Sequence, residues 1–441
     1  MFLKLGIIGS GSIFSTHYKS YAYNKYVAPF GIYDRSRARA QQWVNKFKEE
    51  LGWILDDAQD EGETEMVERT QFALDNLRAY DTAHELLDAA DIFDICTPPS
   101  HHMPYAIMAL ERGKCAMNEK PPGLNYIETK KLLEVAANSA GKYQLNENWY
   151  WQPHVRLTGQ LVHEGKIGTP TKVTVALGHT GPSWGYLGFF YDPFKNGGGC
   201  LTDMGPHSHA WAIGLIGEKI TLDKIQCTSL TTGNLPERQI QDANGANVWK
   251  YTKYPFEDDS EDTFWGTTAS GTPIEFHVHT SWAGIFQSAV IEGTEGKITY
   301  MNPGAGVPYI QFEGTDGSTE DIKPPPVEVG PEMIADTYSA ECWGFTKMAV
   351  EGGDSPCGPA ECHQLQTLIT GTYLSNRRGG EPVTIDDIDA YCQTFIDAYP
   401  AWIVRDELIA DLMSPFLADF YTSGMSTNDL LAGYDEDKPS V

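Results

Sequence analysis

The sequence predicts an α/β protein in which an N-terminal doubly wound parallel sheet is followed by an α+β domain with a large, mostly antiparallel sheet. Residues 1–145 alternate short apolar runs with longer helical patterns, which is typical of a parallel sheet covered on both faces. From about residue 146, strand-like runs follow one another through Gly-rich turns, as in antiparallel sheets. We therefore expect domains at 1–145 and 146–385, and a helical extension with a polar tail at 386–441.

The N-terminal elements are read from the apolar runs and from the turn residues that end them. Gly113 and Gly141 are typical C-caps that end helical patterns. The expected strands are 4–9, 30–34, 91–99 and 115–119, and the expected helices begin at 14, 37, 67, 82, 104 and 128. In the second domain the expected strand-like runs are 171–180, 222–232, 263–282, 288–301 and 309–322, and helical patterns return at 337–353 and 361–380.

Composition narrows the class of partner. Asp and Glu number 60 against 32 Lys and Arg, a formal charge of −28, so DNA, RNA and anionic membranes would repel the chain. Its acidic runs at 56–68, 257–262 and the C-terminus suggest solvated faces and loops, or a salt-adapted surface. No stretch of about 18 apolar residues predicts a membrane span. The 8 scattered cysteines suggest reduced thiols, so we expect a cytoplasmic protein.

The first strand leads directly into a glycine-rich turn. Gly9 and Gly11 follow a strand and precede a helix, the context in which glycines let the backbone approach a pyrophosphate. This pattern predicts a Rossmann-type dinucleotide site. The third glycine position of the fingerprint is Phe14, which implies looser helix–strand packing or a ring folded away. The residues expected to hold the dinucleotide here are Gly9, Ser10, Gly11, Ser12 and Ile13.

Two further strand ends contribute to the same expected site. Asp34 closes the second strand, where a carboxylate accepts ribose hydroxyls and repels a 2′-phosphate, while Arg35 would do the reverse. We therefore favour NAD and keep NADP as the alternative. The turn after the third strand, Thr97, Pro98 and Pro99, is expected to line the nicotinamide side. His102 begins the next helix, as a ligand of the cofactor or as a capping or surface residue.

The tetrapeptide Asn118-Glu119-Lys120-Pro121 ends the strand after the TPPSHH turn. Further along stand GKIGTP (165–170), GGGCLTDMGPH (197–207), IEGTEGKITY (291–300) and RRGGEPVTI (377–385). In this order the motifs resemble the Gfo/Idh/MocA oxidoreductase family. The resemblance implies NAD(P)-dependent hydride transfer on sugars, inositols and related polyols, and a homo-oligomer, dimeric or tetrameric. It covers the chain to about residue 385.

The resemblance also implies roles for individual residues. Lys120 matches the family's lysine beside nicotinamide and substrate, and Glu119 precedes it in the cofactor site. Asp203 and His207 match the acid and imidazole of its D-x-x-x-H pattern. Asn148 stands near the position that contacts the nicotinamide ribose. The chain departs from the family at 150, where tyrosine replaces a common arginine, and this affects substrate identity more than reaction type.

These residue types suit the oxidation of a secondary alcohol. His207 can take the hydroxyl proton because imidazole titrates near neutral pH. Asp203, one helical turn away, either orients that ring or binds a neighbouring hydroxyl. Lys120 supplies positive charge where an alkoxide develops. The three glycines at 197–199 are expected to keep side chains out of the way of substrate. The alternative for Asp203 and His207 is a surface pair or a structural histidine, the role we expect of His209.

An aromatic-rich loop follows at 179–196, and aromatic faces suit the apolar faces of pyranose rings. Trp184, Tyr186 and Trp149 are therefore expected to bind substrate together with Lys120, Asp203 and His207. A buried loop or an oligomer contact is the alternative. The substrate favoured by this composition is a sugar or glycoside rather than a small aliphatic hydroxy acid.

Three other functions remain open. One is a glycosidase that oxidises the sugar transiently and keeps its dinucleotide, and another is a non-catalytic protein that binds dinucleotide or sugar. The third is a metal-dependent hydrolase using His207 with His209, or His277 with His279, which would share one side of a strand. Cys357, Cys362 and His363 have loosely metal-like spacing, but no second pair completes a set. We expect no metal.

Overall fold

The structure is a computed structural model that describes residues 2–181, 190, 192–232, 257–304, 307–327, 336–398 and 406–416. The chain forms two compact units. The first unit comprises residues 1–122, 129–153 and 325–363, and the second comprises 123–128, 154–324 and 364–441. The division differs from the sequence-based domain boundaries, since residues 146–153 and 325–363 belong to the first unit and residues 123–128 to the second, and no separate unit begins at residue 386.

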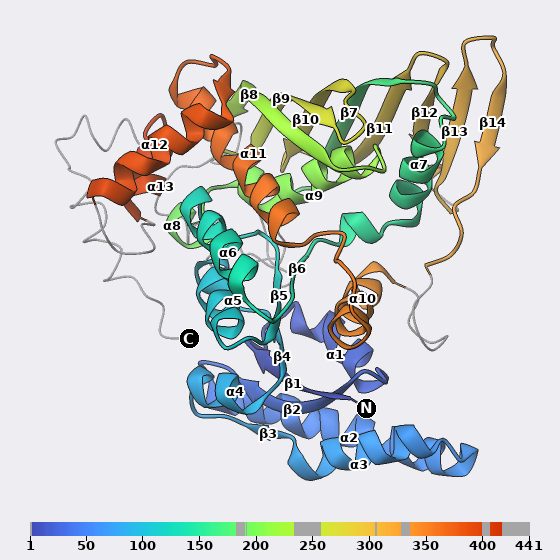
Figure 1. Ribbon diagram of the computed structural model, residues 1–441, viewed down its shortest axis with the longest axis vertical. Helices are drawn as coiled ribbons and strands as arrows, with labels where there is room; N and C mark the ends of the chain where they lie inside the picture. Colours follow the sequence, from blue (N-terminus) through green and yellow to red (C-terminus); the bar gives the residue numbers. More distant parts are fainter. Residues whose placement is uncertain are drawn as a thin grey trace. The chain divides into compact units, whose positions relative to one another are not determined.

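The first unit contains a six-stranded sheet in the order β3-β2-β1-β4-β5-β6, and every pair in it is parallel, as predicted (Figure 1). Its strands are β1 (Leu3–Ile8), β2 (Val27–Tyr33), β3 (Arg78–Ala79), β4 (Ile92–Ile95), β5 (Cys115–Glu119) and β6 (Tyr143–Asn146). The strand order reverses direction at β1, so a topological switch point lies between β1 and β4. Parallel sheets of this order bind ligands outside the carboxyl ends of their strands at that point.

The helices that alternate with these strands are α1 (Phe14–Ala22), α2 (Arg37–Glu61), α3 (Thr64–Asn76), α4 (Ala83–Ala89), α5 (His102–Glu111) and α6 (Tyr126–Asn138), and α10 (Thr337–Glu351) packs beside α1. Two glycines in the strands show how closely the sheet is covered. A Cβ on Gly6 would lie 2.7 Å from the ring of Phe93, and one on Gly31 would collide with Leu86 and Tyr80. Bare backbone at these positions therefore allows the close packing of the sheet.

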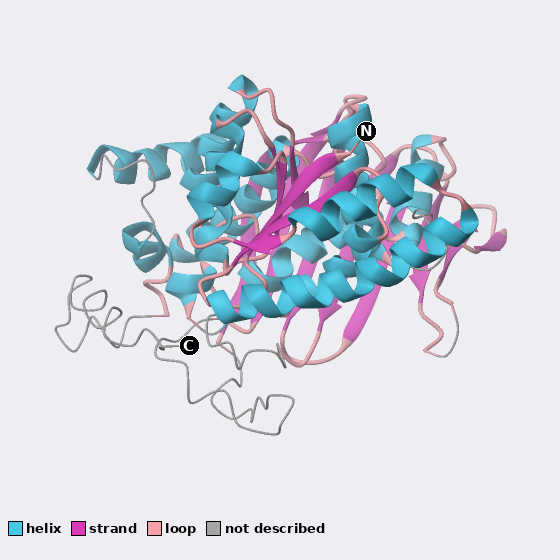
Figure 2. Ribbon diagram, turned by 90° about the horizontal axis from the view of Figure 1, so that it is seen from below, coloured by secondary structure: helices cyan, strands magenta, loops and turns pink. Residues whose placement is uncertain are grey.

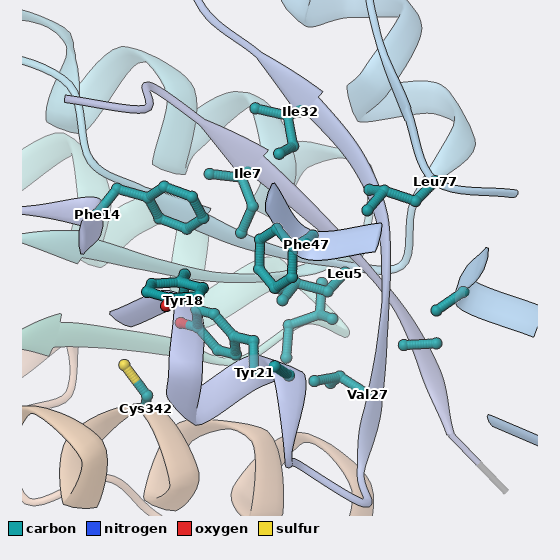
Figure 3. Close-up of a cluster of buried hydrophobic side chains, with 14 of the residues drawn as sticks. Leu5, Ile7, Phe14, Tyr18, Tyr21, Val27, Ile32, Phe47, Leu77 and Cys342 are labelled. Carbon is teal, nitrogen blue, oxygen red and sulfur yellow. The ribbon is translucent and has the colours of Figure 1, made fainter. Parts of the chain in front are cut away.

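One core of the first unit joins β1 and β2 to α1, α2, α3 and α10. Phe14, which replaces the usual small residue of the glycine fingerprint, is fully buried in it. Its ring centroid lies 4.9 Å from that of Trp43 and 5.9 Å from that of Phe47. Figure 3 shows Phe14 and Phe47 in one cluster with Tyr21 of α1 and Cys342 of α10. Of the two expectations for Phe14, the ring folded into the core is confirmed.

Three local features differ from the sequence-based assignment. The helical pattern expected to run through Arg78 ends at Asn76, because the chain then forms the short edge strand β3. The strand β6 was not expected, since its four residues carry two polar side chains that the sheet buries. The acidic run at 56–68 is not a loop: it forms the end of α2 and the start of α3, where its carboxylates are mostly exposed.

The second unit contains a nine-stranded sheet in the order β14-β13-β12-β11-β7-β10-β9-β8-β15 (Figure 1). Figure 2 distinguishes strands from helices by colour. Its strands are β7 (Pro170–Gly178), β8 (Ile220–Thr231), β9 (Asp259–Thr268), β10 (Pro273–Ser281), β11 (Phe286–Gly293), β12 (Gly296–Met301), β13 (Tyr309–Gly314), β14 (Thr319–Ile322) and β15 (Val383–Thr384). The β7–β10 pair is parallel and the other pairs are antiparallel. The prediction of a large, mostly antiparallel sheet is confirmed.

Helix α9 (Cys200–Gly214) packs on strands β7, β9 and β10 of this sheet. The other helices that belong wholly or partly to the second unit are α7 (Pro153–His163), α8 (Pro193–Asn196), α11 (Pro359–Arg377), α12 (Ile385–Ala398) and α13 (Asp406–Leu412). The helical extension expected after residue 385 is therefore present as α12 and α13. None of the helices in the described ranges is long and apolar enough to cross a membrane.

A buried arginine ties α3 to the carboxyl end of α1. Arg69 is 1% exposed, and its guanidinium donates to the carbonyl oxygens of Tyr21 and Ala22, the last residues of α1, and to that of Val27, 2.8 Å away. These carbonyls include groups that a helix end leaves without partners. Burial lowers the pKa of Arg69 to about 9, so the guanidinium stays protonated at neutral pH and keeps its N–H donors.

We predict that Arg69→Met destabilises the chain, because three buried carbonyl groups lose their donors. The expected loss in the free energy of unfolding is about 2–4 kcal/mol. Urea unfolding followed by tryptophan fluorescence measures it. Arg37→Met is the matched control, since Arg37 is exposed and its ion pair with Asp81 is on the surface. Equal stability of the two variants would contradict the structural role.

Candidate functional site

The glycine turn between β1 and α1 has room for an anion on one side only. Gly9 has φ 89°, and a Cβ there would lie 2.8 Å from the backbone of Cys96 and Thr97 at the end of β4. Gly11, in contrast, faces open space, with nothing within 4 Å of a Cβ built on it. Any side chain at Gly11 would fill this space beside the amino end of α1. The turn therefore fits a pyrophosphate, and Ser10, Ser12 and Ile13 complete it.

Asp34, expected to meet the ribose, is already bound within the protein. Its Oδ2 accepts hydrogen bonds from the backbone N–H of Ser10 at 2.8 Å and from the Ser10 hydroxyl at 2.9 Å. Its Oδ1 accepts from Ser36 N–H at 2.7 Å, and Arg39 Nη1 lies 3.6 Å away. Asp34 thus joins the second strand to the glycine turn, which leaves little accepting capacity for a ribose. Arg35 is exposed at this edge.

The turn after β4 carries Thr97, Pro98 and Pro99, which begin a short 3₁₀ helix (Pro99–His101) before α5. His102 is not the surface residue of the alternative expectation, because it is 1% exposed. Its Nε2 lies 2.7 Å from the carbonyl oxygen of Thr97, and its Nδ1 lies 2.9 Å from that of Pro121. His102 therefore links the TPP turn to the turn after β5.

Lys120 lies directly after β5, and its peptide bond to Pro121 is cis. Glu119 is 5% exposed, and its carboxylate lies 3.1 Å from Nε2 of His17. Burial would raise the pKa of Glu119, but His17 and Lys120 outweigh that effect, and the pKa is lowered. Glu119 is therefore a buried carboxylate beside two cations.

Sequence analysis missed the partners of Glu119. His17 in α1, Asp94 in β4 and Glu341 in α10 are all buried with it, although they are far apart in the sequence. A lone histidine in a helix gives no signal of this kind. The parallel pairing of β4 with β5, which the alternating pattern did predict, places Asp94 and Glu119 on neighbouring strands, with Asp94 opposite Met117, two residues before Glu119.

Asn148 and Trp149 lie in a short 3₁₀ helix (Asn148–Trp151) after β6, and each is 8% exposed. The side-chain amide of Asn148 donates to the hydroxyl of Thr337, the first residue of α10, at 3.3 Å. Its amide oxygen is buried and meets no donor among the described residues. This is the one expected ribose contact in the first unit with spare accepting capacity.

Asp203 and His207 lie in α9 of the second unit, four positions apart and so on one face of the helix. Asp203 is fully buried, whereas His207 is partly exposed. Pro206 lies between them inside the helix and supplies no backbone N–H. An imidazole that reaches solvent and a buried carboxylate therefore lie on one face of this helix, while their roles in proton transfer stay a prediction.

Close packing, rather than space for substrate, explains the glycines at 197 and 198 before α9. A Cβ on Gly197, which has φ 88°, would lie 2.7 Å from the carbonyl oxygen of Leu124, and one on Gly198 would collide with the hydroxyl of Tyr373 and with Thr202. Both glycines are therefore required by the packing of the second unit. Our expectation that they clear space for substrate is replaced by this packing explanation.

Glu257, which sequence analysis passed over as part of an acidic run, caps α9. Its Oε1 accepts from the backbone N–H of Gly199 at 2.9 Å and of Leu201 at 3.0 Å, and from the hydroxyl of Tyr373 at 2.6 Å. Glu257 is fully buried. Burial raises its pKa to about 7, although each of these donors lowers it. The helix that carries Asp203 and His207 thus begins on a titratable carboxyl group.

The residues weighed as metal ligands are placed as follows. His209 is fully buried and its Nε2 lies 3.0 Å from Asp262, the structural role expected of it. His277 and His279 share one side of β10, and His279, Asp259 and Glu261 have ligand atoms within 4.8 Å of one another. Cys362 and His363 contact different partners, Tyr143 and Thr129 respectively.

Trp184 and Tyr186, which were expected to bind substrate, lie outside the described residues.

Comparison with known families agrees with this geometry. Residues 3–147 match the model described as oxidoreductase family, NAD-binding Rossmann fold, and residues 155–299 match the GFO/IDH/MocA C-terminal domain. The chain belongs to the Gfo/Idh/MocA family. The resemblance read from the motifs is therefore confirmed, and the first unit is the NAD-binding Rossmann domain of a member of this family.

Individual relatives in the family are distant. The chain is 23% identical over 233 residues to D-glucoside 3-dehydrogenase of Escherichia coli, covering 46% of this chain and 65% of that protein. It is 28% identical over 134 residues to inositol 2-dehydrogenase of Rhizobium meliloti, covering 30% and 38%. The fold resembles that of a levoglucosan dehydrogenase solved with NADH and levoglucosan, with TM-score 0.63, 17% identity and coverage of 87% and 99%. The chain spans between 25% and 65% of the length of the first curated relatives it matches.

We predict that Glu257→Gln changes how stability depends on pH. In the folded chain the pKa of Glu257 is about 7, above its ordinary value of 4.5. The unfolded carboxyl ionises first as pH rises, so the wild type loses stability between about pH 4.5 and 7, whereas the amide does not. The variant should gain about 3 kcal/mol relative to wild type over this window.

Urea unfolding of both proteins at pH 5 and pH 8 tests this. Glu292→Gln, at an exposed position on β11, is the matched control and should show no such difference. A stability difference between Glu257→Gln and wild type that stays the same at both pH values would show that the pKa of Glu257 is not raised in the folded chain.

Proposed function

We propose that this protein is an NAD(P)-dependent oxidoreductase that transfers a hydride between nicotinamide and a ring hydroxyl or ketone of a sugar, glycoside or cyclitol. The observation that carries the proposal is the shared edge of the parallel sheet. The Gly9–Gly11 turn follows β1 and Lys120 follows β5, and β4 lies between these strands. The carboxyl ends of parallel strands lie along one edge of the sheet. The glycine turn that would bind the pyrophosphate and Lys120 are therefore at the same edge.

In this proposal, different residues of the chain bind different parts of the dinucleotide. The glycine turn and the amino end of α1 hold the pyrophosphate. The TPP turn, with Thr97, Pro98 and Pro99, lines the nicotinamide side, and the buried amide oxygen of Asn148 accepts from the nicotinamide ribose. When bound, the nicotinamide supplies or accepts the hydride. His102 and Glu119 act behind this surface rather than on it.

We favour NAD over NADP on the charge of Asp34. Its buried carboxylate stands at the end of β2 and would repel a 2′-phosphate, and its bonds to Ser10 keep it there. Arg35 and Arg39 are the two cations at this edge that would favour the phosphate instead. Asp34 acts both as a brace of the glycine turn and as the negative charge that excludes NADP.

For the chemistry, His207 takes the proton from the reacting hydroxyl while the hydride leaves the same carbon. Lys120 places its ammonium against the oxygen and stabilises the developing alkoxide. Asp203 is fully buried one turn from His207 and supports the imidazolium that forms. In the reductive direction the same groups return the proton. The proposal requires Lys120 and His207 to meet at one substrate oxygen.

The substrate class rests on the named relatives and on aromatic residues. Relatives act on glucosides and inositol by name, and a structural neighbour was solved with levoglucosan. Trp149, with Trp184 and Tyr186, would present ring faces to a pyranose or cyclitol. We further propose assembly into a dimer or tetramer through the open side of the second sheet, and a cytoplasmic location.

We predict that the purified protein reduces NAD in the presence of a sugar, glucoside or inositol, and that Lys120→Ala abolishes this turnover while dinucleotide binding persists. Absorbance of the reduced cofactor measures turnover, and tryptophan fluorescence measures binding. Lys131→Ala, on the surface of α6, is the matched control and keeps full activity. Release of aglycone without net reduction would identify the redox-recycling glycosidase instead. Binding without turnover across a broad panel would indicate a non-catalytic protein.

We predict that Asp34→Ala weakens NAD binding by about tenfold, equal to about 1.4 kcal/mol, because the glycine turn loses its brace. The affinity for NADP should fall less, or rise, because the charge that repels its 2′-phosphate is gone. Titration with each dinucleotide gives the two dissociation constants. Asp81→Ala, an exposed carboxylate in the same unit, should change neither. An unchanged NAD to NADP ratio in Asp34→Ala would remove Asp34 from cofactor selection.

A further inference from the structure

We propose that two buried histidines, His17 and His102, act as positioning residues that hold the two neighbours of Lys120 and so fix the direction of its ammonium group. This inference deepens the proposed function, since it rests on Lys120 acting on the substrate. Every residue in it belongs to the first unit. We call this arrangement the histidine clamp, made of His17 on Glu119 and His102 on Pro121.

The first half of the clamp acts on the residue after Lys120. His102 is 1% exposed at the start of α5, and its Nδ1 lies 2.9 Å from the carbonyl oxygen of Pro121. Its Nε2 lies 2.7 Å from the carbonyl oxygen of Thr97. Burial lowers the pKa of His102, and a neutral ring carries one N–H, so it donates to one of these two carbonyl oxygens while the other stays in contact with the ring. The ring therefore fastens the turn that carries Lys120 to the TPP turn of the neighbouring strand.

The second half acts on the residue before Lys120. His17 is fully buried in α1, with Nδ1 2.9 Å from Oδ2 of Asp94 and Nε2 3.1 Å from Oε1 of Glu119. The Asp94 contact is a hydrogen bond, whereas the Glu119 contact is off the N–H direction and is best described as an ion pair. Both neighbours are carboxylates, which accept and do not donate when ionised. A ring between them is favoured when both nitrogens carry protons.

The surroundings of His17 agree with a doubly protonated ring. Burial by itself lowers the pKa of His17, but the negative charge of Asp94 and its hydrogen bond to the ring raise it above its ordinary value. Burial raises the pKa of the Cys342 thiol, so this thiol carries no charge near pH 7, and burial also raises the pKa of the Glu341 carboxyl group. The titratable groups that act on the ring are Asp94, Cys96, Glu119, Tyr338, Glu341 and Cys342.

The backbone at Lys120 is held as well. The side-chain amide of Asn118 donates to the carbonyl oxygen of Glu119 at 2.8 Å, and the hydroxyl of Tyr143 donates to Asn118 at 2.7 Å. The carboxylate of Glu119 also receives the amide of Asn146 at 3.4 Å. The carbonyl group of Glu119 is thus held from β5, its carboxylate from α1 and β6, and the carbonyl group of Pro121 from α5.

Together these contacts restrict where the ammonium group of Lys120 can lie. The charge of Lys120 lowers the pKa of Glu119 and acts on that of His102, so it lies within electrostatic reach of both. A lysine side chain is long and flexible, and its usefulness depends on where its backbone points. Misplacing a reacting group by about 1 Å costs about 100-fold in rate. The clamp limits that misplacement.

The test uses the full chain and the substitutions His17→Gln and His102→Gln. Each should lower kcat by about tenfold or more with little change in the dissociation constant of NAD. In protein labelled with [ε-¹³C]lysine, the resonance of Lys120, assigned by its loss in Lys120→Arg, should shift in both variants, with a displaced titration midpoint. Since this resonance needs no substrate, it reports on position independently of turnover.

Two histidines outside the clamp serve as controls. His84 is exposed on α4, and His84→Gln should change nothing. His154 is 6% exposed in α7 and packs on Tyr300 in the second unit, so His154→Gln should lower the melting temperature without moving the Lys120 resonance. If His17→Gln and His102→Gln behave like His154→Gln, losing stability with an unchanged resonance and unchanged kcat, the clamp is overturned.

A measurement on the wild-type chain tests the clamp even where the variants do not fold. In [¹⁵N]histidine-labelled protein at pH 8, His17 should show two protonated ring nitrogens. A single N–H at His17, or a stoichiometric metal ion bound to its ring nitrogens in elemental analysis, would overturn the clamp. Failure of the proposed function shows differently: Lys120→Ala would keep its turnover while the Lys120 resonance still responds to His17→Gln.

Discussion

The charge balance around His17 is the constraint on which the first unit depends. Three acidic side chains, Asp94, Glu119 and Glu341, are removed from water around one imidazole. Burial of unpaired charge is costly, so the cluster favours a protonated ring at His17 and the protonated form of Glu341, whose pKa burial raises. Because its members come from α1, β4, β5 and α10, this one cluster joins both ends of the unit's sequence.

The second unit has a comparable dependence at the start of α9. Glu257 comes from a segment far from the helix in sequence, yet its carboxyl group satisfies the first backbone N–H groups of α9. The glycines at 197 and 198 bring Tyr373 and Leu124 against the same end. The position of Asp203 and His207 is therefore set by packing at the beginning of the helix, and the acidic run at 257–262 is partly structural rather than a solvated face.

Sequence patterns predicted the parallel and antiparallel sheets, the glycine turn and the helix of Asp203 and His207, because these follow from local periodicity and turn chemistry. They did not predict β3 and β6, whose few residues carry no clear period. Nor did they predict the roles of His17, Arg69 and Glu257, since buried charge is recognised only when its distant partners are known. The same limit explains Asp34, which was assigned to the ribose but also braces Ser10.

The parallel β7–β10 pair has a consequence for how the second sheet forms. Strand order β7-β10-β9-β8 means that the chain leaves β7, crosses through α9 to β8, and returns until β10 fills the place beside β7. Parallel neighbours need such a crossover, and contacts between distant residues form slowly. During synthesis, β7 must wait for more than a hundred later residues, roughly the stretch from 179 to 281, before its edge is covered.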